Sequence, residues 1–138
     1  MIIRRGTESD KRTILEQYPY TAEVIGEGGF LFVAAEEEKT LGFLWSFIRD
    51  IPADIGKTEC FINVIEVFDD SYRRKGIGSL LVQKCIAYSK EKGCYQVRAY
   101  CEIGNRPSNM LWVKNGFTIS PVKNPDGSIF GSYAARIL

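Results

Sequence analysis

Apolar and polar positions along the chain follow strand-like and helix-like spacings in turn. Runs rich in β-branched and aromatic residues predict strands at Ile2–Arg4, Phe30–Glu36, Leu41–Arg49, Cys60–Phe68, Tyr95–Cys101, Phe117–Val122 and Ser132–Leu138. Helical spacing and end signals predict helices from Thr7 or Ser9 to Tyr18, at Thr21–Ile25, over Ser79–Lys92 and from Asn105 to Trp112. This order predicts a mixed α/β fold.

Two segments refine that fold. The strand, helix and strand between Cys60 and Cys101 predict a parallel crossover unit. In the hairpin of residues 30–49 both faces of each strand are apolar, which implies cover on both sides. Alternation places on one face Phe30, Phe32, Phe43, Trp45 and Phe47, and on the other Leu31, Val33, Leu44 and Ile48. We therefore predict a mostly antiparallel sheet of six to seven strands, with a central parallel pair and helices on both faces.

Composition adds the expected class and compartment. The 138 residues are 45% hydrophobic and 25% charged, typical of one globular domain over residues 1–138. A net charge of +1 gives no reason to expect a nucleic-acid or membrane partner. No apolar run reaches the length of a membrane span, and Met1–Arg5 does not begin a signal-peptide pattern, so we expect a cytoplasmic protein.

The cysteines and the lack of histidine exclude several kinds of site. Cys60, Cys85, Cys94 and Cys101 show no C-x-x-C spacing, and the chain has no histidine. We therefore expect buried reduced thiols and no metal. Catalytic triads that use an imidazole base are excluded.

Candidate chemistry begins at a glycine turn. The segment Arg73-Arg74-Lys75-Gly76-Ile77-Gly78 lies between the strand at Cys60–Phe68 and the helix at Ser79–Lys92. Glycines let the backbone approach a ligand closely, and N–H groups at a helix N-terminus attract anions. The turn therefore predicts a phosphate site. It matches neither the nucleotide-binding G-x-x-x-x-G-K-[ST] pattern nor the three-glycine dinucleotide pattern.

Two motifs carry a resemblance to a known family. Arg73-x-x-Gly76-x-Gly78 is similar to the R/Q-x-x-G-x-G/A signature of the GNAT superfamily of N-acetyltransferases. The second, Asn105-x-x-Ser108-x-x-Leu111-Trp112-x-x-x-Gly116-Phe117, resembles that family's helix motif. The resemblance implies an acetyl-CoA-dependent N-acetyltransferase. Such an enzyme moves the acetyl group to a primary amine of a small molecule or peptide by direct attack in a ternary complex.

The resemblance also implies cofactor contacts. Backbone amides of the turn would hold the pyrophosphate of acetyl-CoA, from Arg73, Arg74, Lys75, Gly76, Ile77, Gly78 and Ser79. The three basic side chains would either reach phosphates or form a solvated turn. The pantetheine arm would pair with backbone near Val67 or Phe68, where the parallel strands splay apart. Asn105 would bond the pantetheine, cap its helix, or do both. Trp112 would pack against the cofactor arm or the core.

Glu66 is the candidate base, because it is the only acid inside the central strand. An alkylammonium with a pKa near ~10.4 must lose a proton before it attacks. The alternative is that Glu66 points into solvent or pairs with an arginine. An N–H near Val67 or Phe68 would stabilise the oxyanion. Trp112 stands where the family often has a proton-donating tyrosine, so Tyr133, Tyr100 or solvent would have to protonate the departing thiolate.

The acceptor and one local detail stay open. The resemblance places the acceptor groove at about Glu16–Gly29 and Pro121–Tyr133, which does not distinguish a small amine from a peptide or a lysine. The rival function is a non-catalytic acyl-CoA sensor or interaction module. Either a monomer or a homodimer is compatible with the sequence. The signature's spacing also implies an extra residue, a bulge, within residues 68–71.

Overall fold

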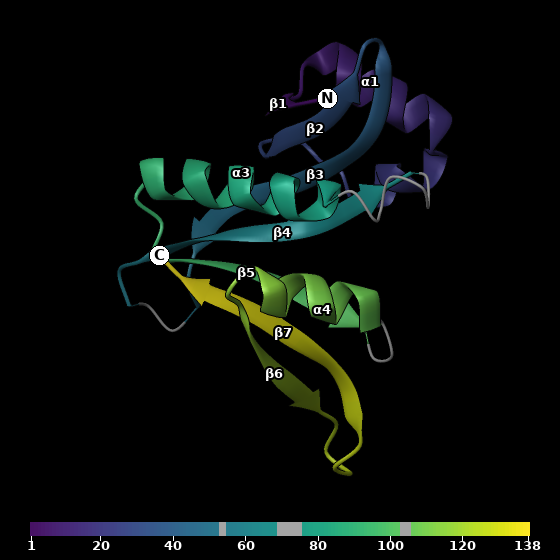
Figure 1. Ribbon diagram of the computed structural model, residues 1–138. Helices are drawn as coiled ribbons and strands as arrows, with labels where there is room; N and C mark the ends of the chain where they lie inside the picture. Colours follow the sequence, from purple (N-terminus) through teal and green to yellow (C-terminus); the bar gives the residue numbers. More distant parts are fainter. Residues whose placement is uncertain (53–54, 69–75, 103–105) are drawn as a thin grey trace.

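One sheet of seven strands runs through the molecule in the order β1-β2-β3-β4-β5-β7-β6 (Figure 1). The computed structural model describes residues 1–52, 55–68, 76–102 and 106–138. The strands are β1 (Ile2–Arg5), β2 (Phe30–Glu36), β3 (Lys39–Asp50), β4 (Thr58–Val67), β5 (Gln96–Glu102), β6 (Thr118–Lys123) and β7 (Ile129–Ile137). Among the described strands, β4 and β5 pair in parallel, and the other neighbours are antiparallel. The predicted fold is confirmed, including its central parallel pair.

Helices cover both faces of this sheet, as the apolar hairpin predicted. They are α1 (Glu8–Gln17), the 3₁₀ helix η1 (Pro19–Glu23), α3 (Ile77–Glu91) and α4 (Arg106–Lys114). The larger core cluster holds Leu81 of α3 and Trp112 of α4, whereas a second cluster holds Ile14 of α1. The sheet therefore has an α3–α4 face and an α1 face. No helix in the described ranges is long and apolar enough to cross a membrane.

The pairing of β2 with β3 corrects the predicted hairpin faces. Leu31 lies opposite Trp45 and Val33 opposite Phe43, and all of these pack with the α1 cluster. Phe30, Phe32 and Leu44 belong instead to the α3–α4 cluster. Grouping Phe30 and Phe32 with Phe43 and Trp45 was wrong. Alternation within a strand separates its two faces, but only the register between strands decides which faces join.

A bulge in β4 sets which of its side chains face the site. Trp45 pairs with Val64 and Ser46 with Ile62, so Asn63 is an extra residue. Ile62 therefore faces the α3–α4 side while Val64 faces α1. The Asn63 side chain donates a hydrogen bond to the Val24 carbonyl oxygen at 2.8 Å. Residues 69–71, where most of the predicted bulge falls, lie outside the described residues.

Candidate functional site

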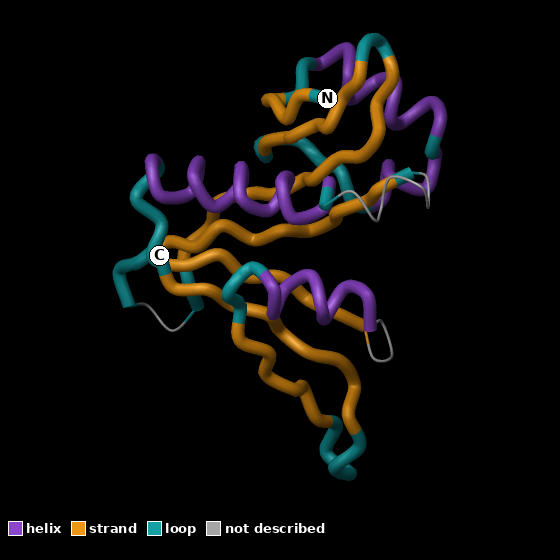
Figure 2. Tube along the Cα trace, in the orientation of Figure 1, coloured by secondary structure: helices purple, strands orange, loops and turns teal. Residues whose placement is uncertain are grey.

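The parallel strands β4 and β5 separate in the middle of the sheet. Their pairing runs only from Glu59 opposite Gln96 to Ile62 opposite Ala99, although β4 continues to Val67. The bulge at Asn63 follows directly. Figure 2 shows the two strands diverging beyond this point, with α3 beside β4 and α4 beside β5. The predicted splaying of the parallel pair is therefore present.

The turn before α3 has the backbone geometry that the glycines predicted. Gly76 precedes the first residue of α3 and has a φ of 75°, in the left-handed region that favours glycine. A Cβ at Gly76 would meet no atom of the described residues within 4 Å. The first N–H groups of α3 have no acceptor within the helix and carry its positive dipole end. An anion fits this position.

Gly78 lies beside the neighbouring helix α4. A Cβ there would lie 3.4 Å from a methyl carbon of Leu111 in α4. A Cβ would therefore make an ordinary contact with α4 and would point away from a ligand at the helix N-terminus. The predicted contact of the Gly78 backbone with a ligand stays a prediction.

The other residues of the predicted turn have different surroundings. The Ile77 side chain is fully buried, so only its backbone can face a ligand. The Ser79 hydroxyl oxygen accepts a hydrogen bond from Asn115 Nδ2 at 3.1 Å. Arg73, Arg74 and Lys75 lie outside the described residues, as does Asn105 in the second motif.

Asn115 connects the two helices beside the site, which the sequence did not predict. It is 6% exposed, and its amide also donates to the Leu111 carbonyl oxygen at 2.8 Å and accepts from Gln83 Nε2 at 2.7 Å. We interpreted Asn115 only as the end of its helix. A buried amide with bonds to both helices fixes the distance between α3 and α4.

The backbone of β4 distinguishes the two predicted pantetheine positions. The Phe68 N–H donates to the Leu41 carbonyl oxygen at 3.0 Å, so it bonds toward β3. Backbone groups alternate along a strand, which turns those of Val67 toward β5. The Phe68 ring stacks on Tyr18, with 4.0 Å between ring centroids. The Phe68 N–H therefore bonds to β3, whereas the backbone of Val67 faces the diverging strand; the predicted pantetheine contacts at both residues stay predictions.

Glu66 lies on the α1 face of β4. It is half-buried and alternates with Ile65 and Val67, which pack on the α3–α4 side. The Tyr20 side chain of η1 lies near the Glu66 carboxylate. Burial, followed by the interaction with Glu66, raises the pKa of Tyr20. No sequence signal singled out Tyr20, which is 53% exposed.

Aromatic residues considered for the chemistry occupy two different regions. Trp112 is 2% exposed and packs on Phe117 in the α3–α4 core, with 5.1 Å between ring centroids. We predicted that Trp112 packs against either the cofactor arm or the core, and the structure places it in the core. Tyr100 and Tyr133 lie opposite each other on β5 and β7, with 5.4 Å between ring centroids.

The cysteines are reduced and buried, as predicted, and each is a free thiol. Cys60 and Cys85 join β4 to α3, with 3.6 Å between their sulfur atoms. In the part of the chain that is described, no three Cys, Asp or Glu side chains are grouped to hold a metal ion.

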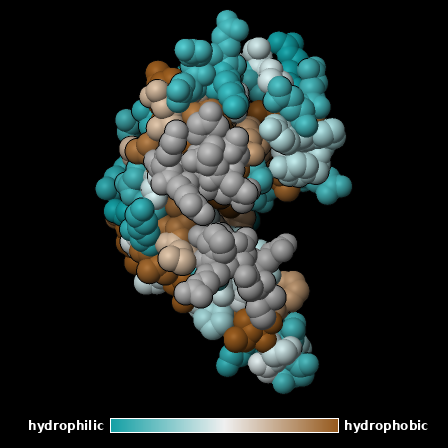
Figure 3. Space-filling view, turned by 45° about the vertical axis from the view of Figure 1, so that its right-hand side comes forward, coloured by the Kyte–Doolittle hydropathy of each residue, from teal (hydrophilic) through white to brown (hydrophobic). Residues whose placement is uncertain are grey.

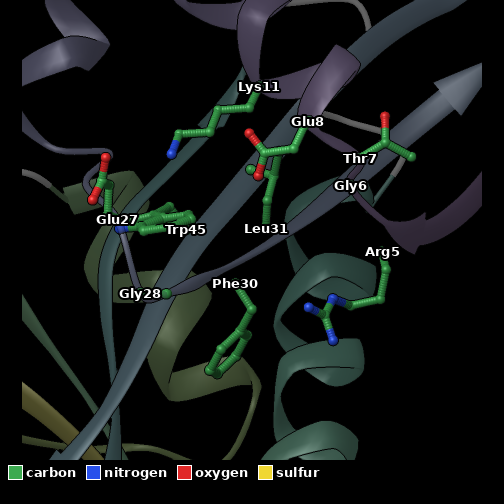
Figure 4. Close-up of a pocket in the computed structure, with 11 residues that line it drawn as sticks. Arg5, Gly6, Thr7, Glu8, Lys11, Glu27, Gly28, Phe30, Leu31 and Trp45 are labelled. Carbon is green, nitrogen blue, oxygen red and sulfur yellow. The ribbon is translucent and has the colours of Figure 1, made fainter.

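A pocket of about 290 Å³ lies at the N-terminal end of α1 (Figure 4). Its cations already have partners within the protein. The Lys11 ammonium donates to the Gly26 carbonyl oxygen at 2.9 Å, and the Arg5 guanidinium lies 4.8 Å from the Tyr88 ring centroid. Glu8 and Glu27 balance their charge. This pocket contains none of the predicted site residues.

The surface is hollowed between the part that carries α1 and the end of the β6–β7 hairpin (Figure 3). These are the two parts of the chain that the sequence assigned to an acceptor groove. Exposed apolar side chains mark the hairpin: Ile129 is 48% exposed and Phe130 57%.

Comparisons with known proteins agree with this arrangement. The family model described as acetyltransferase (GNAT) family matches residues 3–117. A search of curated proteins by sequence found no match.

Solved structures share the fold. One is the ribosomal-protein-S18-alanine N-acetyltransferase of Escherichia coli, with 19% identity, a TM-score of 0.72, and coverage of 99% of this chain and 92% of that chain. Another is the ribosomal-protein-alanine N-acetyltransferase of Brucella melitensis, with 21% identity, a TM-score of 0.75 and 100% coverage of both chains. A third is NAA60 of Arabidopsis thaliana in complex with a bisubstrate analogue, with 16% identity, a TM-score of 0.76, and coverage of 99% and 97%.

Proposed function

The chain belongs to the acetyltransferase (GNAT) family, and we propose that it transfers the acetyl group of acetyl-CoA to a primary amine. One observation carries the proposal. The N-terminus of α3, which starts after the left-handed turn at Gly76, lies beside the point where β4 and β5 diverge. An anion site and a diverging strand pair accommodate the pyrophosphate and the pantetheine arm of one cofactor.

The residues present fit this cofactor. Amides of Gly76, Ile77, Gly78 and Ser79 surround the helix N-terminus and would bind the pyrophosphate. The backbone of Val67 faces β5, where an extended amide chain would pair with it. We retain Arg73, Arg74, Lys75 and Asn105 as proposed contacts because the family motifs place them there. We leave out the Trp112 side chain, because it lies in the core.

Bound acetyl-CoA supplies the thioester whose acetyl carbon the amine attacks. The chain's own contribution is a base on the opposite face of β4. Glu66 accepts the ammonium proton, directly or through one water molecule, with the Tyr20 side chain nearby. As the new N–C bond forms, the C–S bond breaks and its electron pair stays on sulfur. Solvent protonates the thiolate, whose pKa near ~8.5 makes it a good leaving group.

The burial of the cysteine thiols favours direct attack of the amine on acetyl-CoA. A covalent acetyl-enzyme would need an accessible nucleophile, and all four cysteines are buried. The proposed mechanism is therefore a ternary complex of enzyme, acetyl-CoA and amine.

Thiol release from acetyl-CoA tests the function. The purified protein is mixed with acetyl-CoA and with polyamines, amino acids, aminoglycosides and peptides in turn, and free CoA is measured. We expect steady release with at least one class of amine and an N-acetylated product by mass spectrometry. Tight acetyl-CoA binding without turnover for any amine would instead support the non-catalytic sensor.

A further inference from the structure

A cluster of charged and aromatic side chains lies on the α1 face, beside the point where β4 and β5 diverge. We call it the guanidinium cluster; it comprises Arg49, Glu59, Phe61, Arg98, Tyr100 and Tyr133. Its members come from β3, β4, β5 and β7. Their neighbours Cys60, Val97 and Ala134 pack on the α3–α4 side, so alternation places the cluster on the opposite face, which also carries Glu66.

Glu59 organises this cluster. Its carboxylate is fully buried and accepts hydrogen bonds from Arg98 Nε at 2.9 Å and Nη2 at 2.8 Å. Arg49 Nε at 2.9 Å and Gln96 Nε2 at 2.8 Å complete its partners. Two-point pairing between a guanidinium and a carboxylate fixes the plane of the guanidinium. Arg98 is therefore held in one orientation.

The fixed guanidinium lies among aromatic rings and leaves a positive charge in excess. Arg98 Cζ is 4.7 Å from the ring centroid of Tyr133 and 5.6 Å from that of Phe61. The Arg98 side chain is 21% exposed and Tyr133 is 36% exposed, so both reach the surface. Two arginines share the single carboxylate of Glu59. The surface is thus a cationic, aromatic patch that complements a carboxylate or a flat ring.

The position of the cluster sets the length of a ligand that could use it. Arg98 pairs with Phe61, next to the last paired residues of β4 and β5. Glu66 lies further along the same face of β4, roughly 15 Å from Phe61 at the rise of an extended strand. An amino acid, whose amine and carboxylate share one carbon, is too short to reach both. An extended peptide covers this distance with about four residues.

We propose that the amine acceptor is a peptide with acidic side chains about three and four residues from its reacting amine, and that the guanidinium cluster selects it. This proposal rests on the proposed acetyl transfer at Glu66. The amine lies at Glu66, and the chain of the peptide extends toward Arg98 on the side of β5, because Val64 between Glu66 and Phe61 packs with the α1 cluster. A carboxylate there neutralises the excess charge of Arg49 and Arg98, while a lysine side chain is repelled.

Three peptides that differ only at the third and fourth residues after the one with the reacting amine test this selection. They carry Glu, Gln or Lys there, and kcat/KM is measured from thiol release with saturating acetyl-CoA. We expect the Glu peptide to exceed the Gln peptide by about 5- to 10-fold and the Lys peptide to be the weakest. The difference should lie mainly in KM and shrink at high salt. Calorimetric binding of the same peptides in the presence of CoA should give the same order.

Arg98→Gln and Arg12→Gln form a matched pair of variants. Each removes one positive charge, but Arg12 is an exposed residue of α1 outside the cluster. The Glu-to-Gln peptide ratio should fall toward one in Arg98→Gln and stay at the wild-type value in Arg12→Gln. The ratio within one variant cancels any loss of folded protein. If Arg98→Gln does not fold, Arg49→Gln, whose side chain is 39% exposed, should lower the ratio.

Equal kcat/KM for the Glu and Lys peptides in the wild type would overturn this inference while leaving acetyl transfer intact. Turnover of small amines with no turnover of any peptide would overturn it as well. No thiol release with any amine would reject the proposed function itself, so the two failures are distinguishable.

Discussion

Gly76 and Gly93 flank α3 and share one backbone conformation. Both have a φ of 75°, and a Cβ at either would meet no atom of the described residues within 4 Å. We therefore expect an alanine to cost about 1–2 kcal/mol of conformational strain at both positions. Only Gly76 lies at the N-terminal end of α3, where the proposed pyrophosphate site is.

This symmetry makes a prediction with a built-in control. Gly76→Ala and Gly93→Ala should lower the melting temperature by similar amounts in differential scanning fluorimetry. Only Gly76→Ala should also weaken acetyl-CoA binding by calorimetry, because the turn would leave the geometry that presents its amides. An equal change in acetyl-CoA affinity for both variants would place the pyrophosphate elsewhere.

A substitution of Glu66 tests whether this residue is the catalytic base. Glu66→Gln keeps the size of the side chain but cannot take a proton, so kcat should fall by about 10²- to 10⁴-fold. The Kd of acetyl-CoA should stay unchanged, because Glu66 faces α1 and not the α3–α4 side. Glu91→Gln, at the exposed C-terminal end of α3, is the charge-matched control. Nearly full activity of Glu66→Gln would remove this residue from the mechanism.

At the scale of elements, α1 is held by a local network at its N-terminus. Thr7 and Asp10 form a capping box, in which each side chain bonds the other residue's backbone N–H. Arg4 of β1 adds two hydrogen bonds to the Asp10 carboxylate, at 2.6 and 3.0 Å. These contacts attach α1 to the edge strand β1, and α1 leads directly to η1 and Tyr20.

This network makes the free energy of unfolding depend on pH. The hydrogen bond from Arg4 lowers the pKa of Asp10 to about 2 against an ordinary 3.8. A carboxyl group with a depressed pKa stabilises the fold above its unfolded-state pKa, and this contribution is lost as pH falls from about 4 through about 2. Asp10→Asn should therefore lower the free energy of unfolding by about 1 kcal/mol at pH 7. The difference from wild type should shrink in urea titrations near pH 2.

Glu8→Gln is the control for that measurement. Glu8 is an exposed acid in the first turn of the same helix, so its removal tests the helix dipole without the capping box. A loss equal to that of Asp10→Asn, with the same pH dependence, would show that the box and Arg4 add nothing.

At the scale of the whole molecule, the sheet has a weak line between β4 and β5. Four residue pairs join these strands, against seven between β5 and β7. Helices α3 and α4 also connect the two halves of the sheet. Asn115, directly after α4, is hydrogen-bonded to Ser79 and Gln83 of α3. A ligand that pairs with both strands would therefore add to the connection between the two halves.

Ligand binding should accordingly raise thermal stability. A ligand at 100 times its Kd stabilises the folded state by about 2.7 kcal/mol, which for a domain of this size raises the melting temperature by on the order of 8 °C. We expect this rise with acetyl-CoA in scanning calorimetry. ATP is the control, because it offers phosphates without a pantetheine arm and should give a smaller shift. Equal shifts would indicate a site for phosphates alone.

Local signals explain what could be predicted from the sequence. Alternating apolar residues, the Gly76 turn and helix-end residues depend on neighbours within a few positions, so the elements and their order were confirmed. The two motifs identified the family on the same basis. The Glu66 position in the central strand followed from the same pattern.

The register between strands and long-range contacts decided the features that the sequence did not predict. The sequence by itself determined the strands, helices and family, because backbone preferences and short motifs act locally. Tertiary structure alone placed the bulge at Asn63, brought Tyr20 near Glu66, paired Arg98 with Glu59, and turned the Phe68 N–H toward β3. These pairs are far apart in sequence, and only the alignment of one strand against the next decides which side chains meet.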